Sequence, residues 1–220
     1  NLNAAVLQIN KFKGTLDGNP ISAQASIRNF NNPSIFLTLA TSASLKKLAE
    51  LMPDAPIQFT NGSMAINVNL NGLWSDFSAV NNIEKTNANG SIVIKDAAFR
   101  LPNSSLVCKN GNGTFSFEKN DLKINQLNAQ LGSSDLALQG YFRNLLGFVL
   151  FPDQSLQIDA QLKANKINLA ELISSTPTNN TQSEYLIKIN PKLSCNLKVD
   201  INELIFQKFV RARFLYLNID

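Results

Sequence analysis

Apolar and polar residues alternate along most of this chain with a period of two. In residues 63–71, Met64, Ile66, Val68 and Leu70 share one side, while the serine, alanine and asparagines that alternate with them share the other. Residues 192–202 alternate in the same way. Such runs are typical of half-buried β-strands with one apolar and one hydrated face. The pattern therefore predicts a mainly β protein, built as an antiparallel sheet with one apolar face.

Turn signals separate these runs, and two segments have the character of short helices. The helices are expected at 44–54 and 168–177, since each begins at a serine or asparagine suited to capping and is closed by a proline. The sequence Gly-Asn-Gly at 111–113 is expected to form a tight turn, and 174–184 a loop. The dipeptides expected in turns are Asp17-Gly18, Asn61-Gly62, Asn71-Gly72, Asn89-Gly90, Asn110-Gly111 and Gly132-Ser133.

One stretch of the chain returns later with much of its pattern intact. Residues 7–30 align with residues 122–145 at a constant offset of 115, and residues 45–52 align with 166–173 after an insertion of about six residues. The identical pairs are Leu7 and Leu122, Ile9 and Ile124, Asn10 and Asn125, Leu16 and Leu131, Arg28 and Arg143, and Asn29 and Asn144. The alternation slips by one residue after Ile9 and again after Ile124, which predicts a β-bulge at the same place in both copies.

The repeat divides one 220-residue domain into four units. The repeated units span 7–52 and 122–173, and the intervening β units span 57–120 and 185–220, the second of them truncated. Repeated β units extend a sheet in one direction, because each unit buries its apolar face against its neighbours. In both copies the arginine closes an alternating strand and the asparagine after it suits a turn. A contact between these arginines and a phospholipid headgroup is a minor alternative.

Composition and charge narrow the function classes. With 44% hydrophobic and 16% charged residues, 220 residues are enough to fill a sizeable core. The net charge of +4 is spread along the chain with one local basic cluster at 208–213, a distribution too diffuse for a nucleic-acid-binding surface. The longest apolar patch, 145–151, is far shorter than a membrane span. The chain starts and stops within strand-like sequence, so we expect an excised fragment of a longer protein.

The residues that usually carry chemistry are scarce. The chain has no histidine, which excludes Ser-His-Asp and Cys-His catalysis and histidine-based metal sites. The acidic pairs Asp200/Glu203 and Asp17/Asp135 are expected to be solvated carboxylates. Cys108 and Cys195 are either two small buried side chains or, in an oxidising compartment, a disulfide. We expect no enzyme activity, no metal and no cofactor.

Two features together resemble the AsmA-like family of Gram-negative envelope proteins. One is the module of paired hairpins at 90–144, and the other is the strand that runs into a short leucine-rich helix at 164–173. The resemblance implies a strongly curved, taco-like β-groove in the periplasm, related in design to TamB and the chorein-type bridge proteins. It also implies a parent protein anchored in the inner membrane by a helix absent here. Members of the family are linked to outer-membrane assembly and phospholipid movement between the two membranes.

The expected function is therefore passive and non-enzymatic. Phospholipid acyl chains would lie on the apolar face and be shielded from water. The sequence does not identify protein partners in the envelope. The alternative is that the same residues form the core of a closed β-sandwich, an adhesion or interaction module that binds a protein or glycan at its loops. The aromatic candidates for lining the groove are Phe30, Phe36, Phe99, Phe115, Phe117, Phe142, Phe148 and Phe151.

Overall fold

The structure is a computed structural model that describes most of the chain. The described residues are 2–16, 18–51, 58–77, 82, 85–100, 106–150, 153–174, 192–207 and 210–219. Within them the protein is mainly β, as the alternating pattern predicts.

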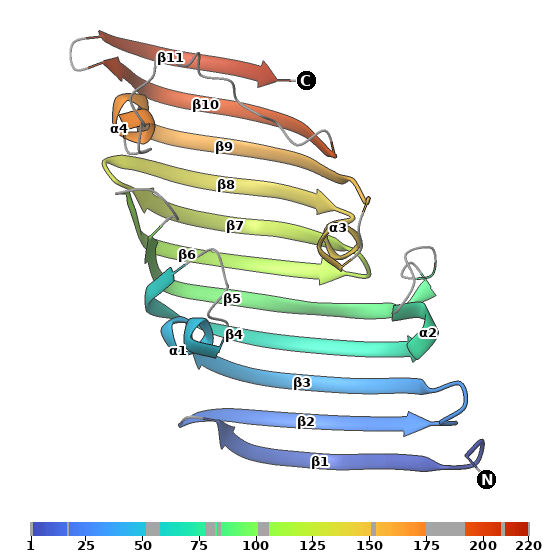
Figure 1. The fold of residues 1–220 in the computed structure, drawn as a ribbon. Helices are drawn as coiled ribbons and strands as arrows, with labels where there is room; N and C mark the ends of the chain where they lie inside the picture. The colour runs from blue at the N-terminus through green and yellow to red at the C-terminus, as the bar shows by residue number, and fades with distance from the viewer. Residues whose placement is uncertain are drawn as a thin grey trace, which may run out of the picture.

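All the described strands belong to one open sheet, whose strand order is the order of the chain (Figure 1). Strands β1 and β11 form its two edges. The strands are β1 (Val6–Leu16), β2 (Asn19–Arg28), β3 (Ser34–Ser44), β4 (Gln58–Leu73), β5 (Asn87–Arg100), β6 (Val107–Glu118), β7 (Asp121–Leu131), β8 (Ser134–Arg143), β9 (Leu156–Asn168), β10 (Leu193–Gln207) and β11 (Val210–Ile219). The strong curvature expected of this sheet stays a prediction.

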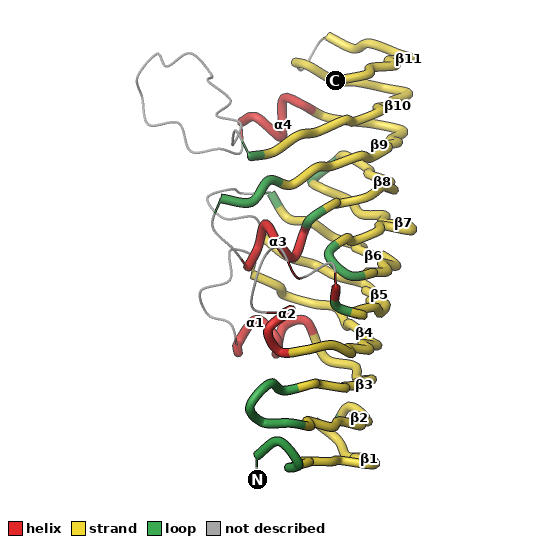
Figure 2. Tube along the Cα trace, turned by 90° about the vertical axis from the view of Figure 1, so that its right-hand side faces the viewer, coloured by secondary structure: helices red, strands yellow, loops and turns green. Residues whose placement is uncertain are grey.

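Short helices lie at the ends of strands, all on one side of the sheet (Figure 2). They are α1 (Leu45–Leu51), α2 (Trp74–Phe77), α3 (Leu145–Leu150) and α4 (Leu169–Ser174). The two predicted helices correspond to α1 and α4. The other two were not predicted, because each is too short for a helical period to stand out from its neighbours. Helix α3 takes up residues 145–150 of the predicted apolar patch.

The predicted bulges occur at the predicted places. Between β1 and β2 the register shifts between Ile9 and Phe12, and between β7 and β8 it shifts between Ile124 and Leu127. The cross-strand partners also correspond at the offset of 115: Ile9 pairs with Ala25, and Ile124 with Gly140. This shared register supports the duplication, which itself stays a prediction.

Several glycines expected in turns lie inside strands instead. Gly18 and Gly132 do sit in hairpin turns with φ of +79° and +57°. The Asn-Gly pairs at 61, 71, 89 and 110, and the Gly-Asn-Gly at 111–113, fall within β4, β5 and β6, so the turn prediction was wrong there. Close packing explains part of this, since a Cβ on Gly90 would overlap the Phe117 ring and the Asn67 carbonyl.

The sheet is mixed, and the prediction of a wholly antiparallel sheet was wrong at one position. Strand β10 runs parallel to β9, with Leu193 paired to Leu156 and Leu204 to Ile167. Every other neighbouring pair is antiparallel. A parallel pair needs a long connection, and eighteen positions, 175–192, separate α4 from β10. Alternation marks the two faces of a strand but not its direction, so the sequence pattern fits both arrangements.

One cluster of fully buried apolar side chains lies where helix α4 meets the ends of β9 and β10. Helix α4 packs Leu169 and Leu172 against a cluster of Ala164, Ile167, Ile201 and Leu204 on β9 and β10. Leu45, the first residue of helix α1, is also buried and is only 3% exposed. These contacts attach the helices to the apolar face near the ends of the strands, away from the strand centres.

Candidate functional site: an apolar face along the sheet

The pairing register places the apolar residues of successive strands side by side on one face. Three rows, which we call the central rows, run across the strands there. The first is Phe12, Ala23, Leu39, Val68, Gly90, Phe117, Leu122, Phe142, Ile158 and Cys195; the second is Gly14, Ile21, Thr41, Ile66, Ile92, Phe115, Ile124, Gly140, Ala160 and Leu197; the third is Ala43, Met64, Ile94, Gly113, Leu127, Leu138, Leu162 and Val199. No charged residue lies in these rows.

The centre of this face is not covered within the described ranges. Among the side chains of the central rows only that of Ile124 is fully buried, at 3% exposure, and the others are half-buried or exposed. Near the first edge Phe12 keeps 48% of its surface exposed. The described strands form a single sheet, so no second sheet packs against these rows in that part of the chain.

The opposite face of the sheet is polar. Directly paired asparagines and serines line its middle, such as Asn67 with Ser91 and Asn69 with Asn89, whose side chains hydrogen bond at 3.5 and 3.2 Å. Tyr141 also lies on this face, 40% exposed. The backbone groups of interior strands are paired within the sheet, so neither face offers them as binding groups.

The aromatic residues expected to line a groove lie in different parts of the structure. Phe115, Phe117 and Phe142 lie in the central rows. Phe99 lies near the end of β5, where its ring meets that of Phe59 edge-on at 5.5 Å between ring centroids. Phe148 is half-buried in α3.

Of the remaining three candidates, two lie off the apolar face and one cannot be placed. Phe30 lies in the turn between β2 and β3 and is 42% exposed. Phe36 pairs with Ser26 and Asn71 on the polar face, so its assignment to the lining was wrong. The neighbours Ile35 and Leu37 take the apolar positions of β3. Phe151 lies outside the described residues.

Sequence reasoning missed the role of glycine in shaping this face. A Cβ on Gly113 would lie 2.7 Å from the Phe115 ring, and one on Gly90 would overlap the ring of Phe117. Both glycines therefore make space for a phenyl ring to lie flat on the sheet. The signal was present, since Gly111 and Gly113 have the strand period of two and stand in phase with the phenylalanines that follow.

The two cysteines are free and differ in environment. Cys108 is buried at 5% exposure, and this burial raises the pKa of its thiol. Cys195 is exposed and closes the first central row on β10. The cysteine pair is thus not a disulfide in this structure.

The carboxylate of Asp135 has a structural role on β8. It accepts hydrogen bonds from the backbone N–H groups of Asn165 and Lys166 at 2.9 and 2.8 Å, which tie β8 to β9 beyond their last paired residues. Asp17, its expected acidic neighbour, lies outside the described residues. In the ranges that the structure covers, no three acidic or cysteine side chains gather in a way that would hold a metal ion.

The same described ranges contain no helix with the length and hydrophobicity needed to cross a membrane. Comparisons with protein-family models, with curated proteins and with solved structures found no match to this chain.

Proposed function

We propose that this chain is a lipid-carrying segment of an AsmA-like envelope protein, and that its apolar face holds phospholipid acyl chains. The observation that supports the proposal is the uncharged face formed by the central rows, which continues across ten strands without a covering sheet in the described part. A protein of this length with one sheet normally covers such a face with a second layer.

The dimensions and energetics suit acyl chains. Strands lie about 4.8 Å apart, so the first row, from β1 to β10, is about 43 Å long. Each methylene group removed from water gains about 0.8 kcal/mol. Because the backbone hydrogen bonds of interior strands are satisfied within the sheet, a lipid chain lying on it meets no unpaired polar group.

The cellular setting follows from the resemblance to AsmA-like proteins. In the proposed arrangement a helix of the parent protein holds it in the inner membrane, and this segment forms part of a periplasmic path for phospholipids toward the outer membrane. The segment needs no catalytic residue, since acyl chains move passively along an apolar surface. The closed β-sandwich alternative would need a second sheet over the central rows, and the described strands supply one sheet only.

A photo-crosslinking experiment tests the proposal on one strand. Two variants of the whole 220-residue chain carry p-benzoylphenylalanine in place of either Val68 or Asn69, which are neighbours on β4 but face opposite sides of the sheet. Each is mixed with vesicles of radiolabelled phosphatidylethanolamine and illuminated. We expect the probe at Val68 to crosslink lipid and the matched probe at Asn69 to stay at background. Equal labelling at both positions, or none at Val68, would contradict the proposal.

A further inference from the structure

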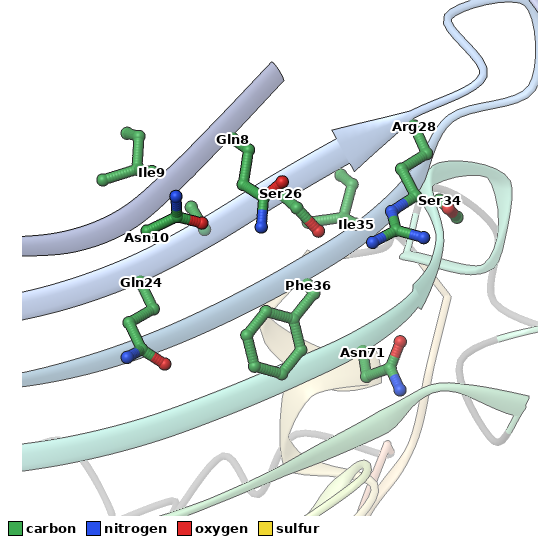
Figure 3. Close-up of a pocket in the computed structure, with 11 residues that line it drawn as sticks. Gln8, Ile9, Asn10, Gln24, Ser26, Arg28, Ser34, Ile35, Phe36 and Asn71 are labelled. Carbon is green, nitrogen blue, oxygen red and sulfur yellow. The ribbon is translucent and has the colours of Figure 1, made fainter. Parts of the chain in front are cut away.

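A hollow on the polar face contains Arg28, which has no ion pair with any residue that the structure describes. The hollow has a volume of about 410 Å³ and lies over β1 to β4, where Gln8, Gln24, Ser26, Arg28, Phe36 and Asn71 line it (Figure 3). Figure 3 shows the guanidinium group of Arg28 extending from the end of β2 toward Ser34, on the side where Asn71 lies. Arg28 is exposed, and within the described part of the chain the structure gives it no ion pair.

The corresponding arginine in the second copy is neutralised by two carboxylates. Arg143 lies 3.2 Å from Asp159 through its Nε atom and 3.9 Å from Asp121 through Nη1. Its guanidinium also lies 5.5 Å from the centre of the Tyr141 ring. The guanidinium group of Arg143 therefore already binds side chains of its own sheet.

The two carboxylates are absent from the first copy. At the offset of 115, Asp121 corresponds to Val6, which pairs directly with Arg28. Asp159 pairs with Tyr141 on the neighbouring strand, and the same register position in the first copy, opposite Ser26, holds Phe36. An arginine thus stands at both positions, but at the first an apolar side chain stands in place of each of its two acidic partners.

The surroundings of Arg28 favour a negatively charged ligand with a ring or other apolar surface. Strands β1 to β4 contain no aspartate or glutamate, and β1 adds the cations Lys11 and Lys13. A guanidinium binds carboxylates and phosphates through two parallel hydrogen bonds. The Phe36 ring is 40% exposed beside it and offers an apolar platform, while the amides of Gln8, Gln24 and Asn71 can bind hydroxyl groups.

From these observations we propose that the hollow around Arg28 binds an acidic sugar, that is, a saccharide ring carrying a carboxylate or a phosphate. Arg28 would bind the anionic group, Phe36 would contact the face of the ring, and the amides would bind its hydroxyl groups. The site lies on the face opposite the central rows, so it is independent of lipid binding.

Binding of defined sugars to the whole chain tests this proposal. The ligands are a glucuronic-acid disaccharide, glucose 6-phosphate, glucose and inorganic phosphate, each titrated by isothermal calorimetry. We expect at least one of the two acidic sugars to bind at least tenfold more tightly than glucose and than inorganic phosphate. Comparison of these two sugars distinguishes a carboxylate from a phosphate. Binding of neither, or phosphate binding as tightly as the sugars, would overturn the proposal.

Two sets of variants locate the binding. Arg28→Gln should weaken acidic-sugar binding at least tenfold, and the double variant Val6→Asp/Phe36→Asp should do the same by pairing Arg28 with carboxylates as in the second copy. Arg143→Gln is the matched control and should leave binding unchanged. Circular dichroism checks that each variant is folded. An unchanged affinity in folded Arg28→Gln, or an equal loss in Arg143→Gln, would refute the assignment.

Discussion

Ile66 and Ile92 face each other on β4 and β5, in the middle of the apolar face. Replacing both with aspartate puts two carboxylates into the second central row. The next residues along the strands, Asn67 and Ser91, are also directly paired but face the polar side. The variant Asn67→Asp/Ser91→Asp therefore makes the same change of charge on the same two strands. Like charges directly opposite each other destabilise both variants. The apolar-face variant also loses the burial of two half-buried isoleucines, so its fold has to be checked separately.

The expected loss of lipid-binding free energy follows from the width of the patch that the two carboxylates keep hydrated. Two carboxylates on adjacent strands keep about 10 Å of the face wet, since strands lie about 4.8 Å apart. If a lipid recovers part of its contact on the neighbouring rows, we take the net loss as about three methylene groups, or about 2.4 kcal/mol. That corresponds to a rise of about 50-fold in the lipid concentration needed for half-maximal occupancy.

Lipid binding is measured by photo-crosslinking next to the substituted residues. The photoreactive residue at position 68 lies on β4 in the adjacent row, and crosslinking to radiolabelled phosphatidylethanolamine is measured against lipid concentration. The Ile66→Asp/Ile92→Asp variant should need about 50-fold more lipid, and the polar-face variant should behave like the unmodified protein. The reasoning is refuted if the apolar-face variant keeps its fold by circular dichroism and still crosslinks at the original lipid concentration. It is equally refuted if the polar-face variant loses as much.

Three further predictions concern stability and accessibility. The Ser133 hydroxyl and then its backbone N–H, at 2.6 and 3.0 Å, lower the pKa of the Glu171 carboxylate. Glu171→Gln should therefore cost about 0.5–1 kcal/mol of unfolding free energy at pH 7. The difference in stability between the variant and the unmodified protein should disappear as pH falls below about 4.3 and through the lowered native pKa, because the carboxylate is then protonated. A difference in urea unfolding that persists at low pH would contradict this. Gly90→Ala should cost about 1–3 kcal/mol because the new Cβ overlaps a phenyl ring and a carbonyl oxygen, and an unchanged melting temperature would show that the strand adapts. Maleimide should label exposed Cys195 in the native protein but Cys108 only after unfolding, and phosphatidylethanolamine vesicles should slow the first reaction; labelling unaffected by lipid would argue against acyl chains reaching β10.

Alternation predicted the strands and two of their register shifts, but not the shifts in the β4–β5, β5–β6, β6–β7 and β10–β11 pairs. The slip after Ile9 and after Ile124 was visible as a change of phase, and both became shifts of register. The turns were less predictable, because Asn-Gly also suits a bulge or a close approach of ring and backbone, as at Gly90. The parallel direction of β10 left no trace in the sequence, since direction is set by a connection and not by the faces of the strand.

The apolar face was predicted as a collective feature, and its individual members were predicted unevenly. Phe36 was chosen for its hydrophobicity, although its phase differs from that of Ile35 and Leu37. Phase is the better guide on a sheet, because neighbouring residues point to opposite faces. The hollow at Arg28 was not predicted, since it depends on which side chains the neighbouring strands place beside the arginine.

Strict chain order in the sheet has a consequence for how the protein folds. Each strand touches the strands just before and after it in the sequence, so no pairing between distant parts of the chain has to form before the rest. Such a sheet can grow one strand at a time from any hairpin, and its stability is close to a sum of local terms. Its two edges should therefore open at lower denaturant than β5 to β8, and amide hydrogen exchange should protect the centre of the sheet most.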